Sequence, residues 1–404
     1  MISYAEMSET TNAKNIGQIW SKLINERTEW VVDLSIFLLC FGCCVFYSAF
    51  IGDIFTSLIS AMGVTGLLAQ RPIVLLSITG FVLLPLCQLE DLSALKFSSL
   101  VGAGGILYTA AFHALRLLDG SYAQGSEMLS HVPPKMLPTF PKQPLTAWRV
   151  STGTLILINM LCVAFLAHYN SINYFEEMEQ PSQERYSRAV ATGFGISMVV
   201  FVGMMFMGYQ LFGLSAQPLL LNNFPMWKDP LAILARAATG LAITFAYPLM
   251  FAGLKSSLYS MIDGCIKPPE LPKPPKWNFL ASLKPQPLQK PVSERLPVQL
   301  KQRSVLAAVG VITAIAVQCG EEDVSVVLGL VGSVLGCFAA YVLPGMLKIA
   351  LQKQRTEAGL SNSKLEVVVN HGLVVMGLVF GALGVWVTLK TEVDKLRAGG
   401  HRGH

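Results

Sequence analysis

The residues whose types and spacing could do chemistry lie mainly in the stretch from Leu155 to Glu179, where an apolar run turns polar before it has crossed a bilayer. The polar residues that follow the run are His168, Asn170, Ser171 and Asn173, and the acids that close it are Glu176, Glu177 and Glu179. Polar side chains are costly at bilayer depth, so they usually line a cavity or a pathway. The stretch therefore indicates a binding site; the alternative is a helix end that emerges among lipid headgroups.

A second stretch of this kind is 241–263, where Pro248 interrupts an apolar segment. Proline donates no backbone hydrogen bond, so the carbonyl of Thr244, four residues earlier, loses its helical partner. A freed carbonyl beside a hydroxyl can bind a cation or relay a proton. The alternative is a simple kink whose carbonyl is satisfied by a neighbouring helix. Lys255, farther along, is expected to anchor the helix at the cytoplasmic headgroups or, as a second interpretation, to act in gating.

Tyr47 and Ser48 follow the small residues of a Gly42-Cys43-Cys44 segment, and either side chain could face a central cavity or only pack against a neighbour. The sequence contains none of the enzyme signatures GxxxxGK[ST], HExxH and GxSxG, and its six histidines are scattered. We therefore expect no catalytic residue, no metal site and no organic cofactor. The polar residues are interpreted as parts of a pathway.

Composition indicates the class of protein in which these residues must be placed. The chain has 404 residues, of which 52% are hydrophobic and 14% charged, with a mean hydropathy of +0.52. This is too apolar for a soluble domain, so we expect an all-α polytopic membrane protein embedded in a lipid bilayer. The net charge of +5 does not predict nucleic-acid binding, because the basic residues lie in loops between apolar runs, where topology explains them.

Nine charge-free runs predict the membrane spans, since each is long enough for a helix to cross the hydrocarbon. The runs are 34–52, 72–89, 97–115, 150–175, 189–227, 237–254, 304–320, 324–347 and 367–389. The 189–227 run is expected to be one helix followed by an apolar loop around Pro218 to Pro225. Loops on the N-terminal side hold 18 Lys and Arg against 11 on the other, which predicts a cytoplasmic N-terminus and an external C-terminus.

These runs divide the chain into five regions. The regions are a cytoplasmic N-terminal segment (1–30), six spans (31–265), a Pro/Lys-rich cytoplasmic loop (266–303), three further spans (304–390) and a tail (391–404). A short helix is expected from Ile16 to Ile24. The loop composition favours an extended tether. Its PxxP elements could bind a cytoplasmic SH3-type partner, and the alternative is an unoccupied spacer.

Several segments resemble the amino acid/auxin permease superfamily, and most closely its sodium-coupled neutral amino acid transporter branch. FLAHYNSINYFEEMEQPSQERYSRAV is similar to the sixth span and following loop of that family, and FAYPLMFAGLKSSLYSMID to its eighth span. RPIVLLSITGFVLLPLCQLEDLSALKFSSLVG is similar to the fourth and fifth spans, and FGCCVFYSAFIGDIFTSL to the third. The resemblance covers most of residues 1–265 and fades beyond.

The resemblance implies a LeuT-type fold, in which two inverted five-helix repeats and an eleventh helix hold the substrate on broken helices at midmembrane. The nine spans would be family spans three to eleven, so the fold would be incomplete. The first family span carries an unwound segment that holds the substrate carboxylate and much of the ion site. We therefore expect that Met1 is not the start of a complete transporter; the sequence would be a truncated gene model, a fragment or a degenerate copy.

The implied function is secondary transport of amino acids, expected to be neutral ones, by alternating access coupled to Na⁺ or H⁺. The residues expected to line the substrate cavity are His168, Asn170, Ser171 and Tyr47, and those expected on the ion side are Thr244 and the carbonyl of Ala246. Sodium-coupled members have a Thr where this chain has Ala246, and an Arg where it has Lys255. These departures favour proton coupling or facilitated exchange.

Two alternatives remain open at this point. The protein could be a nontransporting membrane sensor or scaffold of the same fold that signals through 266–303, or a nonfunctional truncated copy. A membrane enzyme is a weaker alternative, because no catalytic constellation is present. The plasma membrane and the vacuolar or lysosomal membrane are both compatible with the sequence.

Overall fold

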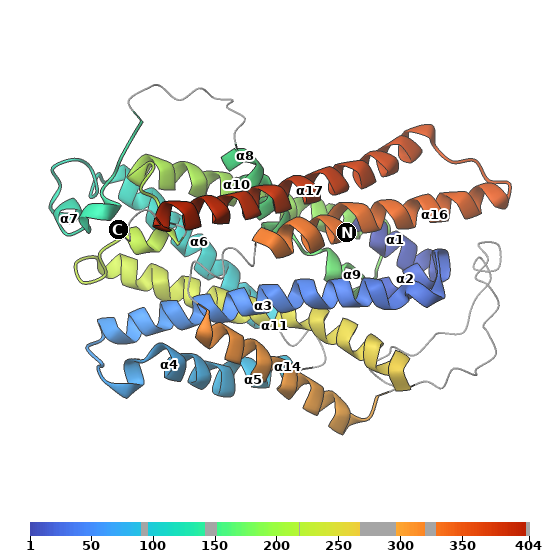
Figure 1. The fold of residues 1–404 in the computed structure, drawn as a ribbon, viewed down its shortest axis with the longest axis horizontal. Coiled ribbons are helices and arrows are strands. Elements are labelled where there is room, and N and C mark those ends of the chain that lie inside the picture. Colours follow the sequence, from blue (N-terminus) through green and yellow to red (C-terminus); the bar gives the residue numbers. More distant parts are fainter. Residues whose placement is uncertain (90–95, 142–151, 218, 267–295, 320–328, 401–404) are drawn as a thin grey trace.

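The computed structural model describes residues 1–89, 96–141, 152–217, 219–266, 296–319 and 329–400. Regular structure in these residues is helical, apart from one isolated bridge between Thr139 and Gly213. Long helices run side by side along the long axis of the molecule (Figure 1). They are α3 (Glu29–Ala61), α6 (Lys96–Leu118), α10 (Gln183–Phe212), α11 (Pro230–Ile266), α14 (Val298–Gln318), α16 (Leu343–Glu357) and α17 (Lys364–Gly400).

Shorter helices complete the architecture. The N-terminal pair is α1 (Ile2–Thr11) and α2 (Ile16–Leu23), and α7 (Glu127–Ser130) lies in the long loop after α6. α4 (Arg71–Ile78) continues through a π-helical turn at Thr79–Leu83 into α5 (Leu84–Gln88). Two further π-helical turns, Gly332–Gly336 and Phe338–Val342, precede α16. Pro85 and Pro344 lie one residue into the helix that follows, where their missing N–H groups account for the irregular turns.

Eight helices among the described residues are long and apolar enough to cross a membrane. The chain is therefore a polytopic membrane protein, as its composition predicts. The predicted helix and loop within 189–227 are confirmed, because α10 ends at Phe212 and only a 3₁₀ turn, Leu220–Asn223, follows before α11. α2 confirms the expected short helix near Ile16, and α17 continues through residues 391–400 as part of the last helix.

The fourth predicted span, 150–175, does not form one continuous helix and is not among these eight. α8 (Thr152–Ala164) ends after 13 residues, three residues leave the helical conformation, and a 3₁₀ turn at His168–Asn170 leads into α9 (Ser171–Glu176). Polar residues replace apolar ones at this point of the sequence, and their side chains offer the backbone other hydrogen-bond partners. The span is therefore broken where its sequence turns polar.

α3 and α11 lie against each other through the middle of the molecule, and α6 packs on α11 (Figure 1). The approach of α6 depends on glycine, because a Cβ on Gly105 would lie 2.5 Å from the carbonyl oxygen of Ala238 on α11. Small residues let backbones of membrane helices approach this closely. The main hydrophobic core forms where α3 and α11 meet the N-terminal helices, α14 and α16.

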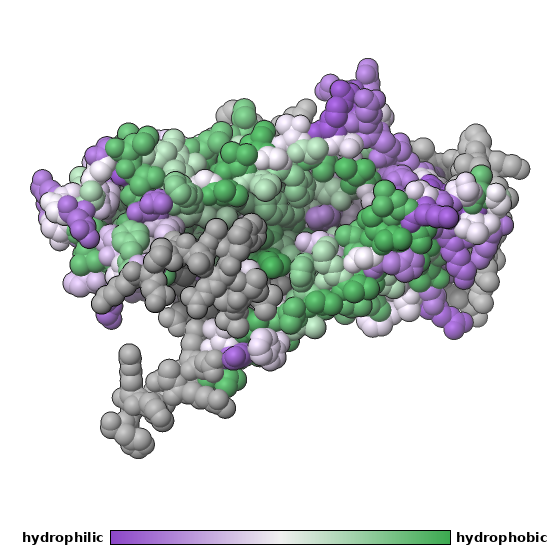
Figure 2. All heavy atoms as spheres, turned by 90° about the horizontal axis from the view of Figure 1, so that it is seen from above, coloured by the Kyte–Doolittle hydropathy of each residue, from purple (hydrophilic) through white to green (hydrophobic). Residues whose placement is uncertain are grey.

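Connections alternate between the two ends of the molecule. The start of α3, the end of α11 and the turn between α16 and α17 lie at one end, whereas α7 and the start of α11 lie at the other (Figure 1). Figure 2 shows apolar side chains over the middle of the visible face and more hydrophilic ones towards its ends. This agrees with loops on alternate sides of a bilayer. Which end faces the cytoplasm stays a prediction. Residues 267–295 of the Pro/Lys-rich loop lie outside the described residues.

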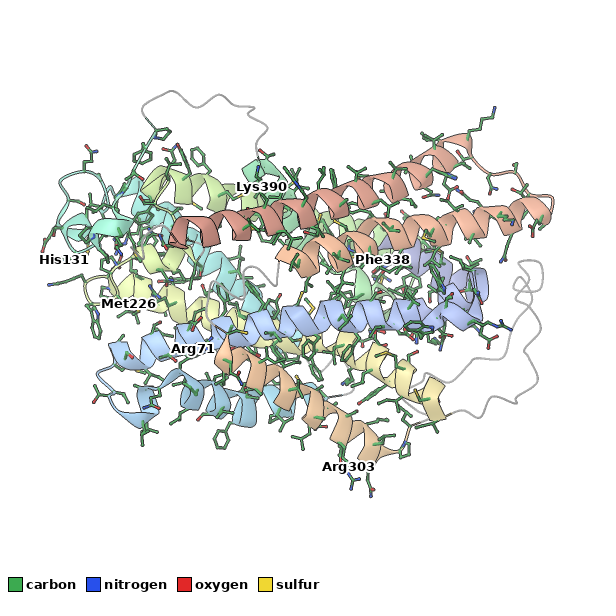
Figure 3. All side chains as sticks on the ribbon, viewed as in Figure 1. Arg71, His131, Met226, Arg303, Phe338 and Lys390 are labelled. Carbon is green, nitrogen blue, oxygen red and sulfur yellow. The ribbon has the colours of Figure 1, made fainter. Side chains whose placement is uncertain are left out.

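Arg71, labelled in Figure 3, joins three helices where α4 begins. Its guanidinium contacts the carboxylate of Asp53 on α3 and donates to the carbonyls of Ala316 and Val317 at the end of α14, at 3.0 and 3.2 Å. Helix ends leave carbonyls without partners, so a half-buried arginine is well suited to satisfy them. Arg71 thus has a structural role.

Candidate functional site

The break between α8 and α9 is the centre of the candidate site. Its backbone tightens first, because the amides of Phe165 and Leu166 bond the carbonyls of Leu161 and Val163, both at 3.0 Å. The chain then leaves helical geometry at Ala167, with φ −124° and ψ 8°, before the turn that contains His168. Backbone outside a regular helix is tolerated at membrane depth only where protein or a cavity satisfies it.

Asn170 ties this break to α11. Its side chain is completely buried, and its Nδ2 donates a hydrogen bond to the carbonyl of Leu249 at 2.7 Å. Its Oδ1 accepts from Nδ2 of Asn173 at 3.3 Å. The amide that the sequence singles out therefore faces another helix rather than lipid.

Ser171 is also completely buried but contacts other partners. Its Oγ lies 2.7 Å from the carbonyl oxygen of Met1 and 2.9 Å from the hydroxyl of Tyr186 on α10. The hydroxyl of Tyr186 also donates to the carbonyl of Ser171 at 2.9 Å. Ser171 thus joins the start of α9 to α1 and α10, away from the contact that Asn170 makes with α11.

His168 and Tyr47 are half-buried near the same region. The ring of His168 meets the ring of Phe194 edge-on, with centroids 6.3 Å apart. Its Nδ1 is buried and has no hydrogen-bond partner among the described residues. Tyr47 packs against the main core from α3.

Thr244 and Ala246 lie within an unbroken part of α11. Pro248 is accommodated inside this helix, and Thr244 is only 3% exposed, with its Oγ1 donating to the carbonyl of Gly240 at 2.7 Å. Residues two positions apart in an α-helix point about 200° apart around its axis. The structure therefore does not bring the Thr244 side chain to the face of Ala246, and neither residue lines the cavity beside the break.

That cavity has a volume of about 20 Å³, close to the space of one water molecule. It lies where the segment before α2, α3, the break and α11 meet. Its lining residues are Lys14, Asn15, Ile16, Asp33, Ile36, Tyr169, Ile172, Asn173, Gly253, Ser256 and Ser257. Asn173 connects it to the break, because the same side chain bonds Asn170. The site is thus a buried polar junction rather than an open pocket.

Two glycines allow this junction to close. A Cβ on Gly253 would overlap the Tyr169 ring and lie 3.0 Å from Sγ of Cys40, so the ring packs directly on the backbone of α11. A Cβ on Gly17, in the first turn of α2, would lie 2.5 Å from the carboxylate of Asp33. Any larger residue at either position would push apart the elements that enclose the cavity.

Sequence reasoning missed Asp33, which is only 4% exposed. The predicted charge-free run begins at residue 34, one position after Asp33, and so does not include this carboxylate. Helical spacing could have revealed it, because Asp33, Ile36 and Cys40 fall on one face and the two apolar members are buried or line the cavity. A charge at a core position of a spanning helix is the signal that was overlooked.

Lys255 differs from the expected headgroup anchor. Its Nζ donates to the carbonyl of Cys87 at 3.4 Å and also contacts the carbonyl of Leu89, at the end of α5. The last carbonyls of a helix lack intrahelical partners and carry partial negative charge, so a lysine ammonium satisfies both needs. The gating interpretation stays a prediction.

Comparison with known proteins shows which family the chain belongs to. Residues 1–390 match the protein family described as transmembrane amino acid transporter protein. The chain belongs to this family. Its members are transporters rather than enzymes, which accounts for the missing catalytic motifs, and membership implies an amino acid substrate and a membrane location.

Relatives of this transporter family member are distant but extensive. It is 21% identical over 393 residues to human sodium-coupled neutral amino acid transporter 7, covering 94% of this chain and 76% of that protein. It is 21% identical over 246 residues to vacuolar amino acid transporter 6 of Saccharomyces cerevisiae, covering 60% of this chain and 52% of the yeast protein. Yeast vacuolar amino acid transporter 7 is 22% identical over 266 residues, covering 63% and 49% of the two chains. The resemblance found in the sequence is thus confirmed.

Proposed function

We propose that this protein is a secondary transporter that moves neutral amino acids across a membrane by alternating access, within a LeuT-type arrangement of helices. The observation that carries the proposal is the bond from the buried Asn170 amide, at the break between α8 and α9, to the carbonyl of Leu249 on α11. In a chain of this family, a broken span held against a continuous one is the arrangement that can bind a solute and change its contacts.

The break supplies the groups that an amino acid needs. A substrate with a carboxylate and an ammonium requires hydrogen-bond donors and acceptors in a site from which lipid is excluded. His168, Asn170, Ser171 and Tyr47 are proposed as the residues that line the site when it opens. The buried and unpartnered Nδ1 of His168 is one group that a substrate or water could satisfy there.

Coupling to an ion is part of the proposal, with Thr244 and the Ala246 carbonyl on the ion side. Ala246 contributes no side-chain oxygen, and the Thr244 hydroxyl already donates within its own helix. A proton, or a cation with additional ligands elsewhere, therefore suits this chain better than a Na⁺ site built only from these two residues.

Uptake by proteoliposomes tests the proposed function. Purified protein is reconstituted, and uptake of labelled neutral amino acids is measured with a Na⁺ gradient, with a pH gradient and with neither. We expect saturable uptake that unlabelled neutral amino acids inhibit and that one of the gradients increases. Reconstituted protein that takes up no amino acid under any gradient, and shows no exchange across preloaded liposomes, would overturn the proposal in favour of a nontransporting sensor.

A further inference from the structure

Asp33 places a carboxylate inside a helix of membrane-spanning length, and the side chain is 4% exposed. A buried carboxylate is costly unless a partner or a ligand compensates its charge. Its neighbours are Ser260 on α11 and the backbone of Gly17, where a Cβ would lie 2.5 Å from the carboxylate. No Lys or Arg of the described residues forms an ion pair with this carboxylate.

We propose that the cavity beside Asp33 binds a monovalent hard cation such as Na⁺, with the Asp33 carboxylate as its charged ligand. Hard cations prefer oxygen ligands. The cavity supplies side-chain oxygens from Asn15, Asn173, Ser256 and Ser257 in addition to the carboxylate. One negative charge surrounded by neutral oxygens suits a monovalent cation better than a divalent one.

The size of the cavity agrees with this occupant. Its volume of about 20 Å³ accepts a single water molecule or a dehydrated monovalent ion, and is too small for an amino acid. The amides on its wall retain free oxygen capacity. Asn173 uses Nδ2, not Oδ1, to bond Asn170, and Oδ1 of Asn15 accepts one backbone hydrogen bond, from Gln18 at 2.7 Å.

Positive charge near the cavity is already engaged. Lys14 is on its wall, but Nζ of this lysine lies 2.7 Å from Oε1 of Glu176 in an ion pair. The first turn of α2 approaches Asp33 at Gly17 and contributes only a partial positive charge. Glu29, one turn earlier on α3, lies near both Asp33 and the ammonium of Lys22. The Lys14 ammonium on the cavity wall thus has a partner other than Asp33.

The site connects to the proposed substrate site through one side chain. Asn173 lines the cavity and also bonds Asn170, which in turn bonds Leu249. A cation bound to the Asn173 oxygen would hold the break between α8 and α9 in this closed arrangement. Release of the cation would let the break move. This coupling rests on the proposed function, whereas binding of the cation does not.

Thermal unfolding of the full chain in detergent micelles measures binding without transport. The protein is titrated with NaCl against choline chloride at constant ionic strength and constant pH. We expect a saturable rise in Tm of about 2 °C or more with Na⁺ and none with choline. Asp33→Asn, which keeps the side-chain size, should abolish the rise, and Glu184→Gln, which removes an exposed carboxylate on α10, should leave it unchanged.

Ser257→Ala is the second variant, because it removes one oxygen and keeps the charge. It should shift the midpoint of the Na⁺ titration to an about tenfold higher concentration, and it reports on the site even where Asp33→Asn does not fold. A wild-type Tm that responds equally to Na⁺ and choline would overturn the inference. So would a Na⁺ response that Asp33→Asn or Ser257→Ala leaves intact. Stabilisation at low pH in place of a response to Na⁺ would also overturn it. A Na⁺-dependent Tm in protein that transports nothing would refute only the proposed function.

Discussion

The amide nitrogen of Asn170 lies 2.7 Å from the carbonyl oxygen of Leu249, although the two residues are 79 positions apart in the chain. This bond holds the broken segment against α11 in the interior of the molecule. Removing the Asn170 side chain would leave the Leu249 carbonyl buried without its donor, which lowers the free energy of unfolding by about 1–3 kcal/mol.

Asn170→Ala should therefore lower Tm by several degrees and reduce uptake by about tenfold or more. Asn170→Asp should be at least as damaging, because a carboxylate oxygen would face the Leu249 carbonyl. Thermal unfolding and uptake are the measurements, and Gln124→Ala, at an exposed glutamine, is the control. Unchanged uptake in Asn170→Ala at normal expression would exclude this residue from the site.

Gly253→Ala should separate α11 from the break. The new methyl group would overlap the Tyr169 ring and lie 3.0 Å from Sγ of Cys40, so the ring must move, at a cost of roughly 1–3 kcal/mol. Gly264→Ala on the same helix is the matched control, because nothing lies within 4 Å of its new Cβ. We expect a lower Tm for the first variant and an equal or higher Tm for the second; the opposite order would mean that the ring does not pack there.

Asp229→Asn should destabilise the opposite end of the molecule. Asp229 is completely buried, accepts two bonds from Arg116 at 2.9 and 2.6 Å, and accepts a third from the hydroxyl of Tyr122 at 3.1 Å. Burial and the neighbouring carboxylate of Asp229 raise the pKa of Tyr122 well above its ordinary value, so this phenol stays a donor. Removing one charge of a buried pair costs about 3–5 kcal/mol.

The comparison for that pair is Asp119→Asn. Asp119 bonds the same arginine at 2.8 Å, but its side chain is 31% exposed, and exposed pairs contribute less than about 1 kcal/mol. Thermal unfolding should therefore show a much larger loss of Tm for Asp229→Asn. Equal losses in the two variants would mean that burial does not strengthen the inner pair.

Lys255→Met should leave the end of α5 without its cap. The variant keeps the length of the side chain but removes the ammonium that bonds the Cys87 and Leu89 carbonyls. We expect a Tm several degrees lower, and faster hydrogen exchange in α5, because these carbonyls lose a charged donor. Lys255→Arg should restore part of the protection, and Lys353→Met, at an exposed lysine, should have no effect; protection of α5 that survives Lys255→Met would contradict the capping role.

The sequence by itself determined that this is a helical membrane protein of the transporter family, where most of its long helices run, and that the 150–175 span turns polar near His168. These properties are local, because hydropathy and helical spacing are carried by consecutive residues and a run of polar residues interrupts both. The order of several motifs along the chain also indicated the family.

Only the tertiary structure decided which side chains meet. Asn170 and Ser171 are neighbours in sequence, yet one bonds α11 and the other bonds α10 and Met1. Lys255 contacts the carbonyls of Leu89 and Cys87, which are 166 and 168 positions away in the chain. Asp33 is enclosed by three elements that lie far apart in the chain. The physical reason is that a buried polar group is satisfied by whatever packing brings to it, and the packing of distant helices is not written in any single stretch of residues.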